Sequence, residues 1–208
     1  MKKINTLLFV LSSVFVAPSF ADDSQALQDK LSTLKSFNAQ FVQKVTDKDG
    51  QAVMQGEGTL ALQQPMMIRW QQTTPDDTLF VSNGVKTYYF DSFAEQVTIM
   101  DTSSLIDSTP FVLLTSKDPV QWDKYKVLAT NSGFSVTPNE GVESQVEQLD
   151  ISFSPNQQGL SKLVVTDNSG QLSSFMFTKT EINKKLDKNT FEFTVPAGVE
   201  VDDQSDSE

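Results

Sequence analysis

Two residue types are missing from this 208-residue sequence, which contains no cysteine and no histidine. Without cysteine there can be no disulfide framework and no lipid attached to a thiol of the chain. Without histidine there is no Ser–His or Cys–His nucleophile pair and no usual general base, and zinc and copper lose their commonest ligand. A chain of this length can still bury an adequate core. We therefore expect no metal site, no cofactor and no catalysis except by carboxylates.

Basic residues are scarce, with 16 lysines and arginines against 27 aspartates and glutamates and a formal net charge of −11. An acidic chain repels nucleic acid and anionic lipid surfaces, so we expect no nucleic-acid partner. The acidic run at residues 202–208 indicates a solvated, disordered end. Residues 47–50 are similar to the start of a calcium loop, but they lack its later acidic positions, and a hairpin turn is the better interpretation.

The N-terminus indicates a targeting signal. Two lysines precede a mostly apolar run over residues 4–16, and small residues follow at Ser19 and Ala21. This is the pattern of a signal peptide cleaved after Ala21. The run is shorter than the roughly 20 apolar residues that a membrane span needs. We predict that residues 1–21 are removed, that the rest is exported, and that residues 22–208 form a single domain, because no repeat, linker or composition shift divides them.

Hydrophobic periodicity predicts one amphipathic helix followed by many short strands. The helix is expected over residues 23–36, where Leu27, Leu31 and Leu34 form a single narrow stripe. After that helix the apolar period changes to two, which is typical of strands. The predicted strands cover residues 37–42, 54–62, 66–72, 78–82, 86–91, 96–101, 126–130, 134–137, 146–153, 159–166, 172–180 and 191–195.

The strand series is interrupted by apolar helical turns. These are predicted at residues 103–106 and 110–114, with a third over residues 119–125. Antiparallel chains of this kind close into barrels or stack as sandwiches, and Gly56 and Gly58 on one strand face allow the strong coiling that a barrel needs. A closed barrel filled with side chains does not require apolar helices, whereas an open barrel with an apolar mouth requires a cover.

A series of short segments stands in a specific order along the chain. They are residues 37–44 (FNAQFVQK), 65–70 (PMMIRW), Pro75, 81–84 (VSNG), 88–91 (YYFD), 95–98 (EQVT), 109–111 (TPF) and 191–199 (FEFTVPAGV). Each segment alone is weak evidence of kinship. Taken together, their order and spacing resemble those of the LolA family of outer-membrane lipoprotein carrier proteins. The resemblance covers nearly all of the chain after residue 21.

The resemblance implies a mainly β fold, a half-open antiparallel β-barrel of about eleven strands with a lid of short α-helices over an apolar cavity. It implies a periplasmic chaperone rather than an enzyme. Such a protein would take triacylated lipoproteins from an inner-membrane ATP-driven release complex, hold their acyl chains, and pass them to an outer-membrane receptor of similar fold. We expect it to work as a monomer.

Acyl-chain contacts are expected from the helices, the first strand and the barrel interior. The candidates are Leu27, Leu31, Leu34, Phe37, Phe41, Ile68, Trp70, Phe80, Leu105, Ile106, Phe111 and Leu114. Each buried CH₂ contributes about 0.8 kcal/mol, so three chains of roughly 16 carbons would not escape into water unaided. For the same side chains, ordinary core packing is the alternative interpretation.

The family resemblance also bears on how the lid is held. Members often carry an arginine before the proline that corresponds to Pro65, and that arginine is thought to hold the lid shut. This chain has Gln64 there, while Arg69 lies nearby but aligns with a different position. Gln64 and Arg69 are therefore the two latch candidates, and a neutral latch would open more readily than a charged one.

Two other function classes stay open at this point. One is a periplasmic binder or sensor of another lipid-like ligand on the same fold, because function resides in sites rather than folds. The other is a carbohydrate hydrolase that uses two carboxylates, although no acid pair is marked by the sequence. A bound diacyl or triacyl species in native mass spectrometry of the exported protein would favour the carrier, and turnover of model glycosides would favour the hydrolase.

Overall fold

The computed structural model describes residues 20–105, 110–155 and 159–205. Its strands are β1 (Ser36–Thr46), β2 (Ala52–Gln63), β3 (Met67–Thr74), β4 (Thr78–Asn83), β5 (Lys86–Asp91), β6 (Gln96–Asp101), β7 (Tyr125–Ala129), β8 (Gly133–Pro138), β9 (Val146–Phe153), β10 (Leu160–Asp167), β11 (Leu172–Ile182) and β12 (Glu200–Asp203). Its α-helices are α1 (Phe20–Ser32) and α2 (Pro119–Trp122), and its 3₁₀ helices are η1 (Thr102–Leu105), η2 (Pro110–Thr115) and η3 (Lys188–Phe191).

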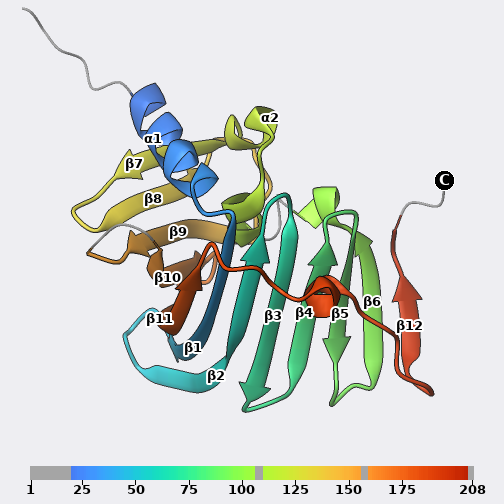
Figure 1. Cartoon of the computed structure of the whole chain (residues 1–208). Helices are drawn as coiled ribbons and strands as arrows, with labels where there is room; N and C mark the ends of the chain where they lie inside the picture. The colour runs from blue at the N-terminus through green and yellow to red at the C-terminus, as the bar shows by residue number, and fades with distance from the viewer. Residues whose placement is uncertain (1–19, 106–109, 156–158, 206–208) are drawn as a thin grey trace, which may run out of the picture.

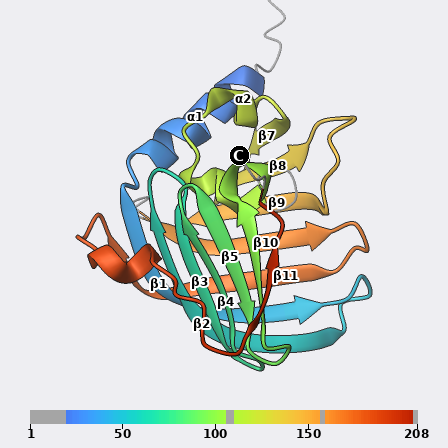
Figure 2. The ribbon, with the colours of Figure 1, turned by 90° about the vertical axis from the view of Figure 1, so that its right-hand side faces the viewer.

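All twelve of these strands belong to one sheet, in the order β12-β6-β5-β4-β3-β2-β1-β11-β10-β9-β8-β7. Neighbours pair antiparallel except β12, which pairs parallel with β6. Figure 2 shows that the sheet turns back on itself, so that β9–β11 run across β3–β5 with a concave face between them. β12 and β7 stand at the two ends of the sheet order, which leaves the barrel open. The predicted half-open barrel is confirmed, with twelve strands rather than about eleven.

α1, α2, η1 and η2 gather at one end of this barrel, whereas η3 lies away from them, against β3 and β4 (Figure 1). α1 packs against β7 and buries Leu27, Leu31 and Leu34, which are 0%, 3% and 7% exposed. The predicted apolar stripe is therefore the face by which α1 attaches to the barrel. α2 starts at a capping residue, because the Asp118 carboxylate accepts a hydrogen bond of 3.0 Å from the main-chain N–H of Val120.

β2 bends where it carries two glycines. In the register of β1 with β2, Phe41 lies opposite Gly58 and Gln43 lies opposite Gly56. A Cβ added at Gly58 would collide with the Phe41 ring and with the main-chain carbonyl of Gln71. The strand can therefore curve over β1 and β3 only because glycine stands there. The curved strand is seen in Figure 1 at the base of the barrel.

The C-terminal ends of α1 and α2 differ from those expected. The predicted helix over residues 23–36 ends at Ser32, and the chain has already entered β1 at Ser36. The reason is a tertiary contact, since the Asn183 side-chain oxygen accepts hydrogen bonds from the N–H groups of Lys35 (2.8 Å) and Ser36 (3.3 Å). The helical turn predicted over 119–125 is also shorter, because α2 ends at Trp122 and β7 begins at Tyr125.

The C-terminal segment differs most from expectation. The strand predicted over residues 191–195 is wrong, because Phe191 closes η3 and the last strand is β12 instead. The disordered end predicted over residues 202–208 is wrong in its first part, since Asp202 and Asp203 pair with β6. The backbone of an acidic segment has paired with a free strand edge, which the side chains alone do not signal. Residues 206–208 lie outside the described residues.

The predicted signal peptide, residues 1–21, falls mostly on residues 1–19, which lie outside those that the structure describes. Among the described residues, no helix combines the length and the apolar character that crossing a membrane requires.

Candidate functional site

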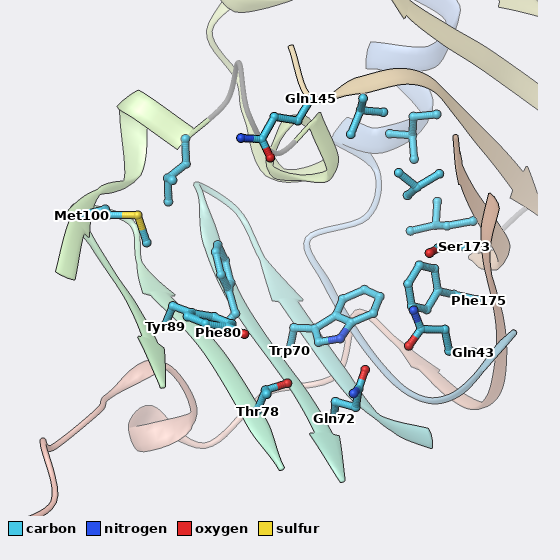
Figure 3. Close-up of a pocket in the computed structure, with 15 residues that line it drawn as sticks. Gln43, Trp70, Gln72, Thr78, Phe80, Tyr89, Met100, Gln145, Ser173 and Phe175 are labelled. Carbon is cyan, nitrogen blue, oxygen red and sulfur yellow. The ribbon is translucent and has the colours of Figure 1, made fainter. Parts of the chain in front are cut away.

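A cavity of about 540 Å³ lies on the concave face of the barrel (Figure 3). One wall, from β3–β6, carries Trp70, Phe80, Tyr89 and Met100. The facing wall, from β9–β11, carries Val146, Leu149, Leu163, Val165 and Phe175. Leu105 of η1 closes the lid side, and the polar lining residues are Gln43, Gln72, Thr78, Gln145 and Ser173. The volume falls in the ~300–1,000 Å³ range of ligand pockets.

Strand register aligns the aromatic side chains of the first wall. Trp70 on β3 lies directly opposite Phe80 on β4, which in turn lies opposite Tyr89 on β5. Directly opposed residues in an antiparallel pair point to the same face of the sheet, so the three rings form one row. The alternation of side chains places Gln72 and Thr78, two residues along from Trp70 and Phe80, on that same face.

Three aromatic rings join the two walls at the base of the cavity. Trp70 lies 4.6 Å from Phe41 and 4.7 Å from Phe175, measured between ring centroids. The Phe41 and Phe175 rings are 5.7 Å apart in an edge-to-face arrangement. Such contacts contribute about 0.5–1.5 kcal/mol each beyond the area they bury. The indole of Trp70 is only half-buried, so it is held firmly while part of it still faces the cavity.

The predicted acyl-contact residues fall into three groups in the structure. Trp70, Phe80 and Leu105 line the cavity. The second group belongs to the buried core that continues behind the cavity wall: Leu27, Leu31, Leu34, Phe37, Phe41, Ile68 and Leu114. Ile106 and the side chain of Phe111 lie outside what the structure describes. In this state the leucines of α1 cover the barrel from above, so an acyl chain would contact them only after the helix shifts.

Sequence reasoning does not identify the second wall. The β9–β11 residues alternate in the expected way, with Leu149 and Ile151 buried on one face of β9. That alternation marks them as inward-facing, but it does not show which other strands they face, because this depends on how the whole sheet turns. Gln43 is also missed, although it shares a strand face with Phe37 and Phe41.

Of the two latch candidates, Gln64 contacts the helices. Its side-chain nitrogen donates a hydrogen bond of 2.8 Å to the carbonyl of Leu31 in α1. Arg69 alternates along β3 with Ile68 and Trp70, so its side chain points to the outer face of the sheet.

A buried hydroxyl network holds the start of η1, and a main-chain hydrogen bond from Met66 holds the end of η2. Thr102 Oγ1 lies 3.0 Å from Ser82 Oγ and 2.9 Å from Thr87 Oγ1, and all three residues are 0% exposed. Ser82 Oγ donates to the carbonyl of Met66 at 2.7 Å. The N–H of Met66 donates in turn to the carbonyl of Thr115 at the end of η2, at 3.2 Å. η1 and η2 are thus each fixed to the barrel.

Among the residues that line the cavity, Tyr89 has a pKa shifted from its ordinary value. Burial, and secondarily the negative charge of Asp91, raises the pKa of the Tyr89 phenol above its ordinary value. The phenol therefore stays neutral at physiological pH and donates or accepts as a hydroxyl. Within the described part of the chain there is no cluster of three or more residues suited to hold a metal ion.

Comparison with known proteins agrees with this architecture. Residues 32–194 match the family model of the outer membrane lipoprotein carrier protein LolA. An outer-membrane lipoprotein carrier protein of Pseudoalteromonas translucida is 81% identical over 208 residues, which is 100% of both chains. Another, from Shewanella loihica, is 37% identical over 204 residues, covering 98% of this chain and 97% of that protein. The crystal structure of an uncharacterized conserved protein from Thermus thermophilus has a TM-score of 0.51 at 9% identity, over 89% of this chain and 100% of that one, a likeness of fold alone.

Proposed function

Since the chain belongs to the LolA family of outer-membrane lipoprotein carrier proteins, we propose that it is a lipoprotein chaperone that encloses the acyl chains of its cargo in the cavity beneath the lid. The observation that carries this mechanism is the pair of apolar walls that face each other across about 540 Å³. A lipid anchor is nearly all CH₂ groups, and such groups gain most from a wall of aromatic and branched apolar side chains.

The size of the cavity requires that the lid move. A pocket in this range holds a ligand of drug size, whereas three chains of roughly 16 carbons expose far more apolar surface. The extra room lies beneath α1, where Leu27, Leu31 and Leu34 now fill the space that cargo would need. In this account the leucine stripe protects the empty barrel from water and then packs on the acyl chains once cargo has entered.

The finer assignments follow from family membership. We infer that the cargo is triacylated lipoprotein, that an inner-membrane ATP-driven release complex supplies it, and that an outer-membrane receptor accepts it. We also infer that the chain works in the periplasm after removal of its first 21 residues. A carrier of this kind binds and releases without bond making or breaking, so we propose no enzymatic activity.

Depletion of the protein followed by membrane fractionation tests the proposal. We expect lipoproteins destined for the outer membrane to accumulate in the inner membrane, and expression of the wild-type chain to reverse the effect. Native mass spectrometry of the protein from the exported fraction should also reveal bound triacylated species. An unchanged lipoprotein distribution after depletion would contradict the proposed function.

A further inference from the structure

One buried polar atom at the cavity has no partner. Gln43 on β1 is 7% exposed, and its side chain lines the cavity. Its side-chain oxygen Oε1 is fully buried and accepts no hydrogen bond from any described residue. Buried side-chain acceptors are paired in the large majority of cases, and an orphan indicates a missing ligand or water.

The strand opposite leaves space for this carboxamide. Gly56 lies directly across from Gln43 in the register of β1 with β2. A Cβ added at Gly56 would stand 3.2 Å from Gln43 Oε1 and 2.8 Å from the carbonyl oxygen of Thr74. On the other side, Gln43 pairs in register with Phe175 of β11, which also lines the cavity. Gln43 therefore stands in a fixed gap between a glycine and an aromatic ring.

Three of the five polar lining residues lie at this gap or on the side of it away from the lid. Figure 3 shows Gln43 beside Trp70 and Phe175, with Gln72 and Thr78 further from the lid helices, whereas Gln145 stands at the lid end. Leu105 of η1 and the aliphatic residues of β9 lie at the lid end. A molecule with a polar linkage and long apolar chains would thus be oriented, with its linkage near Gln43 and its chains toward the lid.

We propose that Gln43 is a polar subsite that accepts a hydrogen bond from an amide N–H at the lipidated end of the cargo. This inference rests on the proposed lipoprotein-carrying function and adds a specificity determinant to it. A triacylated N-terminus joins two of its chains through esters and the third through an amide on the modified cysteine. The N–H donor is therefore either this acyl amide or the first peptide bond that follows it.

The chemistry of Gln43 Oε1 distinguishes lipopeptides from ordinary acyl esters. Ester and thioether groups accept hydrogen bonds but cannot donate them. An ester lipid in the same position would leave the oxygen without a partner, as it is in the empty cavity, and would gain nothing from Gln43. A lipopeptide supplies the donor and so gains a hydrogen bond that relieves the cost of burying this oxygen. The site would select against diacylglycerol-type lipids by this unmet hydrogen bond rather than by size.

The experiment measures displacement of an apolar fluorescent dye by four probes. The parent probe is a tripalmitoylated Cys–Ser peptide amide. In the second its N-acyl amide is replaced by an ester, in the third the Cys–Ser peptide bond is replaced by an ester, and the fourth is dipalmitoylglycerol. The variants are Gln43→Leu and Gln43→Met, which remove the acceptor at similar volume. The matched control is Gln40→Leu, because Gln40 lies on the exposed face of the same strand.

We expect the wild type and Gln40→Leu to bind the parent probe about tenfold tighter than one of the two ester analogues, and that analogue identifies the N–H donor. Gln43→Leu should bind the parent and that analogue alike, with about the affinity that the wild type has for the analogue. Equal affinity of the wild type for the first three probes overturns the subsite. A tenfold preference that survives in both Gln43 variants overturns it as well. Failure of every acyl probe to displace the dye overturns the proposed function and the subsite with it.

Discussion

The side-chain nitrogen of Gln64 donates a hydrogen bond of 2.8 Å to the main-chain carbonyl of Leu31. The last carbonyls of a helix lack partners further along that helix, and this one is shared with the N–H of Leu34, at 2.9 Å. The bond joins the turn between β2 and β3 to the last turn of α1. The chain thus makes, with a neutral amide, a contact between the barrel and α1.

Removing this bond should loosen α1 without unfolding the barrel. A neutral hydrogen bond contributes about 0.5–1.5 kcal/mol, so Gln64→Ala should raise the exchange rate of the α1 amides by roughly two- to tenfold. Hydrogen exchange of the empty protein, followed by mass spectrometry of peptides covering residues 20–34, measures the effect. Gln55→Ala on the exposed face of β2 is the control. Equal exchange in the two variants would show that the bond does not restrain the helix.

Strengthening the same bond should weaken cargo binding. A hydrogen bond from a charged donor contributes about 1.5–3 kcal/mol, so Gln64→Arg should hold the lid closed more firmly. Because cargo must displace the lid, acyl-peptide affinity should fall about tenfold, which corresponds to 1.4 kcal/mol. Hydrogen exchange of the backbone amides in α1 and over residues 110–115 should become slower.

The control for that experiment is Arg69→Leu, since Arg69 faces away from the lid. It should leave both acyl-peptide affinity and exchange unchanged. If Gln64→Arg binds as tightly as the parent and its lid exchanges at the parent rate, position 64 is not the latch.

Local pattern accounts for most of the fold. The spacing of Leu27, Leu31 and Leu34 predicts a one-faced helix, and all three side chains are buried. Strand alternation predicts that Phe37 and Phe41 point inward, and they are 0% and 1% exposed. These predictions succeed because each depends on periodicity within one element, which the burial of one face imposes.

The pairing of strands that are far apart in the sequence could not be predicted. β12 pairs with β6, about a hundred residues earlier, through backbone groups that any side chains could accompany. Likewise, alternation places Gln43 on the inner face of β1, but only the register of β1 with β2 sets it opposite Gly56. The unpartnered oxygen of Gln43 is a property of that pairing, so no pattern in a single segment could reveal it.

The signal-peptide prediction has a direct test. Signal peptidase should cleave after Ala21, so the exported protein should begin at Asp22. N-terminal sequencing of protein from the periplasmic fraction reads this directly, and the cytoplasmic fraction of cells with blocked export serves as the control. A protein that keeps Met1 and remains bound to membranes would contradict both the cleavage site and the proposed compartment.

Cavity occupancy should be visible in the titration of Tyr89. Burial and the Asp91 carboxylate already raise the pKa of this phenol. Acyl chains would exclude more water from the cavity and disfavour the phenolate further, so bound ligand should raise the pKa again. The raised pKa also affects folding. Because the folded protein holds the phenol proton to higher pH than the unfolded chain does, the free energy of unfolding should fall as pH rises above the ordinary tyrosine value near 10.

Tyrosinate absorbance against pH, with and without an acyl peptide, measures the change, and Tyr89→Phe identifies its source. A ligand-induced shift that persists in Tyr89→Phe would assign it to another tyrosine. The absence of any shift at saturating ligand would show that the acyl chains do not reach this wall.

Trp70 and Ile68 lie on the same face of β3, but we expect their replacement by alanine to have different effects on stability and on acyl-peptide affinity. Ile68 is 0% exposed and belongs to the core, whereas Trp70 is half-buried and lines the cavity. Ile68→Ala should lower the free energy of unfolding by about 2–5 kcal/mol and leave the affinity of the folded protein nearly unchanged.

Trp70→Ala should lower stability by less than the roughly 3–5 kcal/mol typical of a fully buried aromatic, because part of the indole faces the cavity. Its main effect should fall on binding, with acyl-peptide affinity reduced about tenfold or more. Urea unfolding gives the stability of each variant, and displacement of an apolar dye gives its affinity. If Trp70→Ala proves as destabilising as Ile68→Ala while its affinity matches the parent, the indole is a core residue. The cargo would then have to contact the facing wall around Leu149 and Leu163 instead.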